Sequence, residues 1–287
     1  MPPHSAAVAE VEKALLPRIE SALAEGRLRL PTLPTVALKV RRVAADPNAG
    51  VDELAQAIAS DVALTARLIA VANSAALSRG VPVQSLRQAL VRLGLNHARD
   101  LVCAIAVEQS FNPRSLSLRT RLVDIWSHSK DVAAISAVLA AHFSRVSAES
   151  ALLAGLLHEV GSLPLLAWLE SEGEAMDLHP AEIEAVLDHL KGPVGARVLA
   201  AWAFPESLAR VPLRAPRGGD SGEEPDLVDV VALACRCHEL DCGRAIEGDS
   251  WRDFPPARRL GFQEPADYLG IGPQLRQRIR DTRQLLQ

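Results

Sequence analysis

The chain has 287 residues, of which 48% are apolar and 3% aromatic, and its formal net charge is −4 at pH 7. This length is enough for one large domain or for two lobes with a substantial buried core. The weakly acidic balance excludes a general attraction to nucleic acid or to anionic membranes, but it leaves room for a local basic patch. The apolar residues are mostly Leu, Val and Ala. Such a core favours packed helices, because β-branched and aromatic residues favour strands.

The sequence gives no sign of a membrane span or a secretion signal. A spanning helix needs roughly 18 or more apolar residues with few or no charges. The richest stretch, residues 151–169, is interrupted by His158, Glu159, Gly161 and Pro164. The acidic N-terminal segment does not resemble a signal peptide, which begins with basic residues and an apolar run. We therefore predict a cytoplasmic protein that does not contact membranes.

Apolar residues at three- and four-residue spacing predict helices along most of the chain. Asp61 is a predicted N-cap, and Ser85 with Gln88 forms a predicted capping box. Gly192-Pro193 is expected to separate two helices. No alternating strand pattern of useful length occurs, so the predicted fold is all-α. The predicted helices cover residues 8–26, about 36–46, 51–60, 61–72, 85–93, 96–109, 118–143, 148–159, 181–191, 193–203, about 226–241 and 273–286.

A cluster of Cys235, Cys237, His238 and Cys242 raises the question of a metal site. If this segment is helical, Cys235 and Cys242 lie about 10 Å apart along the axis, at ~1.5 Å per residue. Cys237 then points to a different side, so a single ion cannot bind all four side chains. We predict reduced, buried structural thiols instead.

Several motifs follow one another in a fixed order along the chain. They are Leu30-Pro31-Thr32-Leu33-Pro34, Asp46-Pro47, the run from Ser60 to Leu68, Ala72-Asn73-Ser74-Ala75, Gln88-Ala89-Leu90, Leu93-Gly94, Trp126-Ser127-His128-Ser129, the run from Ala154 to Gly161, Trp202 and Phe204-Pro205. Together they resemble the HDOD domain, a bacterial signalling module related to the HD superfamily of metal-dependent phosphohydrolases. The resemblance covers roughly residues 28–217. It implies a two-lobed helical bundle with lobes at about 28–113 and 118–217, preceded by a helix in residues 1–27. Residues 218–287 would form a linker and a helical extension.

The resemblance also indicates where the metal ligands of an HD enzyme would lie. His128 stands at the position of the first His, and His158 keeps the His of the His-Asp doublet. Glu159 replaces the Asp, Lys191 falls where a further His is common, and Cys235 lies near the late Asp. A longer carboxylate and a lysine make a poor site for a divalent cation. We therefore predict no catalytic metal, no cofactor and no enzymatic activity.

Two interpretations of these residues stay open. In the first, His128, His158, Glu159, Lys191 and Arg197 form a ligand pocket for a phosphorylated or nucleotide-like molecule, with Lys191 and Arg197 supplying positive charge. In the second, the histidines and Glu159 are relics that hydrogen-bond and pair inside the bundle.

A second candidate site is an exposed interaction loop that contains Asn73, Ser74 and Arg79. The alternative is a helix end followed by a turn, which Asn and Ser favour. Residues 52–72 also have the outline of a helix-turn-helix. However, the second helix offers only Thr65 and Arg67 as polar residues and begins with Asp61, so nucleic-acid binding is not expected.

The sequence thus predicts a non-catalytic signal-transduction module that binds a partner protein or a small ligand. The alternative is a residual metal-dependent phosphohydrolase that acts on nucleotides or cyclic dinucleotides through His128, His158 and Glu159.

Overall fold

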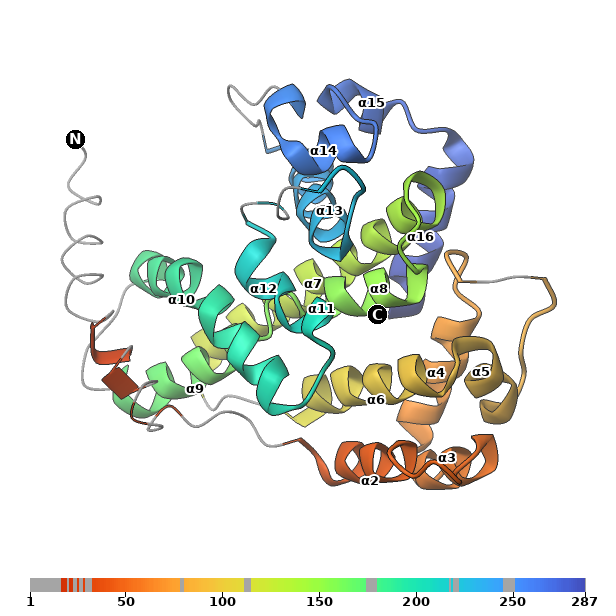
Figure 1. Cartoon of the computed structure of the whole chain (residues 1–287). Helices are drawn as coiled ribbons and strands as arrows, with labels where there is room; N and C mark the ends of the chain where they lie inside the picture. Colours follow the sequence, from red (N-terminus) through yellow and green to blue (C-terminus); the bar gives the residue numbers. More distant parts are fainter. Residues whose placement is uncertain are drawn as a thin grey trace. The chain divides into compact units, whose positions relative to one another are not determined.

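The computed structural model describes residues 17–19, 21, 22, 25, 28, 33–77, 80–110, 115–173, 180–216, 218, 222–244 and 251–286. Within these ranges the regular structure is helical and no strand occurs (Figure 1), which confirms the predicted all-α fold. The helix predicted for residues 8–26 falls largely outside the described residues. So do Arg79 of the candidate interaction loop and parts of the predicted linker that begins at residue 218.

The chain divides into two compact units, each assembled from three separate segments. Unit 1 contains Met1–Thr32, Phe111–Ile125 and His158–Leu213. Unit 2 contains Leu33–Ser110, Trp126–Leu157 and Arg214–Gln287. The long helix α7 (Leu116–Phe143) contributes residues to both units.

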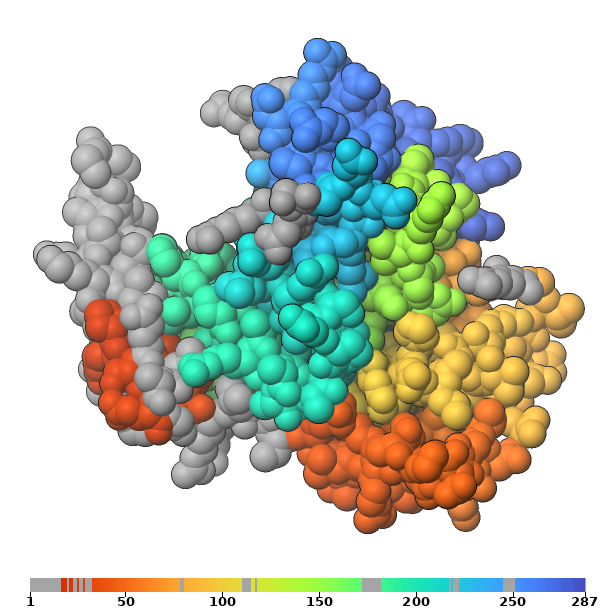
Figure 2. Space-filling model, in the orientation of Figure 1, coloured from red at the N-terminus to blue at the C-terminus, as the bar shows by residue number. Residues whose placement is uncertain are grey.

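The first part of unit 2 is a group of short helices around an apolar core. In Figure 1, α2 and α3 lie side by side, and they pack against α6 and α5 respectively. Figure 2 shows the orange surface of α2 and α3 bordering the yellow surface of the next helices of the same unit. The core is formed by residues such as Leu54, Leu64, Leu68 and Leu90, all at most 1% exposed. These helices are α2 (Thr35–Ala44), α3 (Val51–Ile58), α4 (Val62–Ala72), α5 (Leu86–Leu93) and α6 (Leu95–Ser110).

Both predicted N-caps are present in these helices. The Asp61 side chain accepts a hydrogen bond from the backbone N–H of Leu64, and the Ser85 side chain accepts one from that of Gln88. The Gln88 side chain reaches the backbone N–H of Gln84, one residue before the position expected in a capping box. Each cap satisfies backbone donors that the first helical turn leaves unpaired.

The rest of unit 2 is built around α8 (Ala148–Leu157), whose residues are buried except Glu149 and Ser150. A Cβ added at Gly155 would lie 2.5 Å from the Cα of Ala133 in α7, so the two helices pack backbone to backbone. α13 packs on α8, and α14 and α15 pack on α13. The remaining helices of unit 2 are α13 (Leu227–Asp241), α14 (Pro255–Arg259), α15 (Pro265–Leu269) and the C-terminal helix α16 (Pro273–Leu286). A 3₁₀ turn, η1 (Trp251–Asp253), precedes α14.

The C-terminal helix α16 belongs to the core of unit 2. Leu286 is part of the same apolar cluster as α4 and α6, and its carbonyl oxygen accepts a hydrogen bond from Arg67 at 3.2 Å. The Thr282 hydroxyl accepts a hydrogen bond from the backbone N–H of Ala76. These contacts join α16 to the end of α4, more than 200 residues earlier in the sequence.

Unit 1 is built from the first part of α7, α9 (Ser162–Gly173), α10 (Pro180–Ala201), α11 (Glu206–Ala209) and α12 (Val211–Arg214), the last residue of which is assigned to unit 2. The prediction of two helices around Gly192-Pro193 is wrong, because α10 continues through Pro193. Proline removes one intrahelical hydrogen bond. Here Leu190, Val194 and Val198 are all buried, so packing of one helix face carries the helix past the proline.

One apolar stretch, Ala148–Ser171, has the length and composition of a membrane-spanning helix. In its 18-residue apolar window, 89% is buried inside the protein. Such burial is typical of a core segment, since a spanning helix presents apolar side chains to lipid.

Candidate functional site

The candidate site of unit 1 is formed by the turn that follows α8. The helix ends at Leu157, and His158, Glu159 and Val160 lead into α9. The backbone N–H of Ser162 donates to the carbonyl of Glu159 at 2.9 Å, which fixes the turn. The predicted helix 148–159 is therefore two residues too long. His158 is 7% exposed and Val160 2% exposed, so the turn lies inside the protein.

Gly161 allows this turn to approach α10 very closely. A Cβ at Gly161 would lie 2.0 Å from the carbonyl oxygen of Lys191 and 2.4 Å from the backbone nitrogen of Gly195. Gly195 is equally crowded on its other side, where an added Cβ would lie 2.8 Å from the Cβ of Pro212. Gly161 and Gly195 therefore allow α10 and α12 to pack closely against the turn at residues 158–160, which we call the doublet turn. This close packing places Glu159 beside Lys191.

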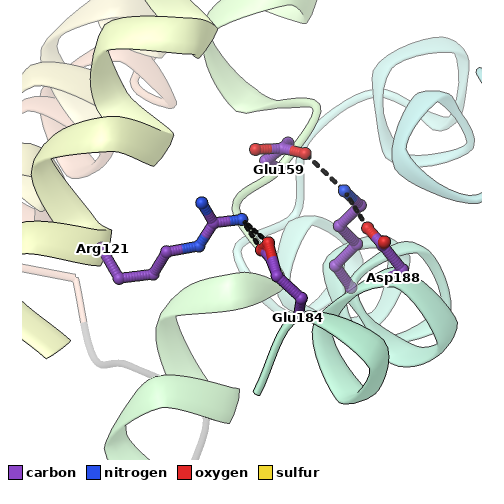
Figure 3. A network of polar contacts seen from close by, with 5 residues as sticks. Arg121, Glu159, Glu184 and Asp188 are labelled. Carbon is purple, nitrogen blue, oxygen red and sulfur yellow. Dashed lines mark hydrogen bonds and ion pairs between the residues drawn. The ribbon is translucent and has the colours of Figure 1, made fainter. Parts of the chain in front are cut away.

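Glu159 and Lys191 form a short, largely buried ion pair. The Lys191 Nζ lies 2.6 Å from Oε1 of Glu159 and 2.9 Å from Oδ1 of Asp188. The side chains of Glu159 and Lys191 are 11% and 24% exposed, whereas that of Asp188 is 67% exposed. Figure 3 shows the carboxylates of Glu159 and Asp188 facing the ammonium between them.

The electrostatics of Lys191 follow from this arrangement. Burial alone would lower the pKa of the amine, because it disfavours the charged form. The charges and hydrogen bonds of Glu159 and Asp188 outweigh burial, and the pKa of Lys191 is raised above its usual value. Lys191 is therefore a fixed cation at the place where the doublet carboxylate points.

A second ion pair lies in the same unit. Arg121 of α7 contacts Glu184 of α10 (Figure 3). Neither Asp188 nor this pair was singled out from the sequence. Asp188 had a usable signal, because it stands three residues before Lys191 on one helix, where opposite charges are neighbours. Arg121 and Glu184 are 63 residues apart and carry no such signal.

The remaining predicted pocket residues do not all join this network. Arg197 lies in α10, six residues after Lys191, and is exposed. His128 belongs to α7 within unit 2, where its ring lies edge-on to that of His238 at 4.7 Å between centroids. A ring nitrogen of His128 and the sulfur of Cys235 lie within 4.8 Å of each other.

The cysteine segment is helical, as predicted, but the prediction that its three thiols are buried holds only for Cys237. Cys103 and Cys237 are buried, Cys235 is half-buried and Cys242 is exposed. The reason is position along the helix, because Cys242 caps the C-terminal end of α13 and lies outside the packed part of that helix. All four cysteines are free.

In unit 2 the candidate interaction loop is held by side-chain hydrogen bonds. The Asn73 side chain donates to the carbonyl of Val83 and accepts from its N–H, both at 2.8 Å. Arg92 donates to the carbonyl oxygens of Ala72 and Val81. Ser74 is fully buried, whereas Val81 is 82% exposed. Val81 is therefore exposed to solvent in this loop, and the hydrogen bonds of the Asn73 side chain fix the loop backbone.

The described residues of unit 1 do not fit a catalytic metal of the HD type. Such a metal would need the doublet carboxylate as a ligand. The carboxylate that stands there is already bound by an ammonium at 2.6 Å. A divalent cation at the same oxygens would meet a repulsion on the order of 8 kcal/mol from that ammonium, at ~4 Å and an effective dielectric of about 20.

With this geometry established, comparison with known proteins assigns the family. The sequence matches the HDOD domain over residues 30–214, which is more than half of the chain. The protein therefore belongs to the HDOD domain family. No relative with a curated functional description matches the sequence.

Solved structures show the same fold. A protein of Shewanella amazonensis SB2B, whose name provisionally assigns it to the metal-dependent phosphohydrolases, has 27% identity and a TM-score of 0.84. The match covers 97% of the present chain and 100% of that chain. An HDOD domain protein of unknown function from Geobacter sulfurreducens has 22% identity and a TM-score of 0.58, with 90% and 93% of the two chains covered. A protein of Marinobacter aquaeolei VT8, provisionally named for signal transduction, has 20% identity and a TM-score of 0.56, with 92% of the present chain and 61% of that chain covered.

Proposed function

We propose that this protein is a non-catalytic signalling module of the HDOD family that binds a partner protein or a small ligand. Family membership supports the signalling role. The ion pair between Glu159 and Lys191 is the observation that supports a loss of catalysis. Hydrolysis by metal-activated water needs an open site for a divalent cation. Here the carboxylate of Glu159 is instead bound by the ammonium of Lys191.

Two carboxylates and partial burial fix the position of the Lys191 ammonium. Lys191 has two carboxylate neighbours, and the one at the doublet position is nearly buried. Taking Lys191 away would leave Glu159 largely buried without its cation, which is costly. Each charge of the ion pair therefore stabilises the other in its position.

The proposal is tested by metal analysis of the purified protein, followed by nucleotide and cyclic-dinucleotide turnover with Mn²⁺ or Mg²⁺. We expect metal well below one ion per chain and no turnover above a His158→Ala control. Stoichiometric metal together with turnover that disappears in the His158→Ala protein would contradict the proposal.

The alternative function is a residual phosphohydrolase, and one comparison favours it. The Shewanella amazonensis protein is provisionally named for that activity and matches 97% of the present chain at 27% identity. The metal and turnover measurement separates the two functions, since a hydrolase must show both a bound cation and dependence on it.

A partner protein would meet unit 2 at the rigid turn around Val81 in this proposal. Val81 is 82% exposed, and Pro82 beside it is also exposed. Because Asn73 and Arg92 fix the backbone of this turn, little entropy is lost when a partner binds it.

Replacing Asn73 with Ala is expected to loosen this turn. Both hydrogen bonds to Val83 are lost, and the backbone groups of that buried residue are left without their side-chain partner. We expect a loss of about 1–3 kcal/mol in the free energy of unfolding, measured by urea denaturation. A matched Gln84→Ala change removes an exposed side chain of the same turn and is expected to leave stability within about 0.5 kcal/mol. Equal stability of the two variants would contradict the role given to Asn73.

A cytoplasmic location is part of the proposal and is supported by the four free cysteines. Nucleic acid is not a proposed partner. The Arg67 guanidinium, the one basic group of the helix-turn-helix outline in α4, lies 2.7 Å from Glu108 and donates to Leu286.

A further inference from the structure

Outside the doublet turn, unit 2 contains a cysteine, a histidine and an aspartate arranged in a line. The Sγ of Cys242 lies 3.5 Å from Nε2 of His238. The other ring nitrogen of His238, Nδ1, lies 3.6 Å from Oδ2 of Asp131 in α7. The second oxygen of Asp131 forms an ion pair with Nε of Arg283 in α16 at 2.5 Å. The three side chains thus stand where α7, α13 and α16 meet.

Helix geometry explains why Cys242 and His238 touch. The backbone N–H of Cys242 donates to the carbonyl of His238 at 3.0 Å, so the two residues are one helical turn apart on one face. Cys237, on another face of the same helix, is fully buried. Cys242 is exposed and His238 is only 13% exposed, so the sulfur faces solvent while the imidazole is held inside.

This order of groups is the one that activates a nucleophile. A thiol becomes reactive when a base can take its proton, and the base is effective when a third group orients it. We propose that Cys242 is a reactive thiol, activated by His238 with Asp131 as the positioning residue, which exchanges with small-molecule disulfides.

The charges around His238 agree with its role as a base. Burial is the main cause that lowers the pKa of His238, and it favours the neutral ring. The groups that face it are Asp131 and His128 from α7, Arg283 from α16, and Asp241 and Arg244 from the end of α13. Asp131 and Asp241 raise the pKa, and Arg283 and Arg244 lower it.

The exchange reaction needs no group beyond the disulfide itself. His238 Nε2 takes the proton of the Cys242 thiol, and the thiolate sulfur attacks one sulfur of the reagent. A new S–S bond to Cys242 forms as the reagent S–S bond breaks. The departing thiolate takes the proton back from His238 and leaves as a thiol. Cys242 is oxidised to a mixed disulfide, and one half of the reagent is reduced.

The other cysteines provide internal references. Burial raises the pKa of Cys103 to about 11, and it raises the pKa of Cys237 well above the usual value. Both thiols are shielded and are expected to stay unlabelled as long as the protein is folded. Labelling of either thiol therefore reports unfolding, which separates a reactivity loss from a folding loss.

The test uses the full chain and dithiobis(nitrobenzoate), with the modified cysteine located by peptide mass spectrometry. We expect Cys242 to be labelled fastest, and His238→Gln to slow it about tenfold at pH 7, because an ordinary thiol is only a few per cent ionised there. His189→Gln, which removes an exposed histidine of α10, is the matched control and is expected to leave the rate unchanged. Equal Cys242 rates in the wild-type and His238→Gln proteins, with Cys103 and Cys237 unlabelled, would overturn the proposal.

The pH profile distinguishes activation from a structural effect. In the wild-type protein the rate is expected to reach its plateau below the range of an ordinary thiol. In His238→Gln it should follow an ordinary thiol that has no neighbouring base. Asp131→Asn should also move the wild-type profile toward that range. A wild-type profile that coincides with that of His238→Gln would likewise overturn the assignment.

Discussion

Replacing Gly161 with Ala is expected to lower the free energy of unfolding by about 3 kcal/mol or more, or to prevent unit 1 from folding. The added Cβ would lie 2.0 Å from the carbonyl oxygen of Lys191 and 2.4 Å from the nitrogen of Gly195. Both are backbone atoms of α10, so no flexible side chain can move aside. The turn and the helix would have to separate, which also breaks the close approach of Glu159 to Lys191.

Thermal and urea unfolding of the purified variant measure this effect. Gly272→Ala is the matched control, because nothing lies within 4 Å of an added Cβ there. That control is expected to be neutral or slightly stabilising, since alanine reduces the entropy of the unfolded chain. A Gly161→Ala protein as stable as the Gly272→Ala protein would show that the turn is not packed against α10 as described.

Replacing Lys191 with Met is expected to cost about 2–4 kcal/mol of stability. Glu159 is 11% exposed and would lose its partner at 2.6 Å. Removal of one member of a buried pair is strongly destabilising, whereas replacement of both members is often close to neutral. The double variant Glu159→Gln with Lys191→Met should therefore recover part of the loss, and urea unfolding of the four proteins gives the coupling free energy.

The pH dependence of this pair has a definite sign. The pKa of Lys191 in the folded protein is raised above 10.5, its ordinary value. The stability that Lys191 contributes is therefore fully present below pH 10.5 and is lost as the pH rises through the folded pKa. The difference between wild type and Lys191→Met should stay constant near neutral pH and shrink only in strong alkali. An exposed control, Lys39→Met, is expected to change stability by less than about 0.5 kcal/mol.

The Lys191→Met variant also tests whether Lys191 occupies the place of a metal ion. If Lys191 stands in place of a metal ion, its removal frees the Glu159 carboxylate. Added Mn²⁺ should then raise the melting temperature of Lys191→Met more than that of the wild-type protein, because the variant lacks the ammonium that binds this carboxylate. An equal shift in both proteins would show that the ammonium does not control metal binding.

The local elements were predictable because their causes are local. The 3.6-residue periodicity predicts α4, α5 and α16, and the caps at Asp61 and Ser85 use side chains within three residues of the backbone groups they bind. The order of the motifs was enough for the HDOD resemblance, since it depends on sequence positions alone. The exposed fractions of the four cysteines were not predictable, because packing against other helices decides them.

The amino-acid sequence by itself determined the helical class, the family and the replacement of the doublet Asp by Glu159. Tertiary structure alone decided that Lys191 meets this carboxylate, 32 residues later in the chain. It also decided that α10 continues through Pro193 and that Cys242, His238 and Asp131 form a line. The physical reason is the same in each case. Contacts between helices depend on how closely backbones approach, and glycines such as Gly161 set that distance without leaving a periodic signal in the sequence.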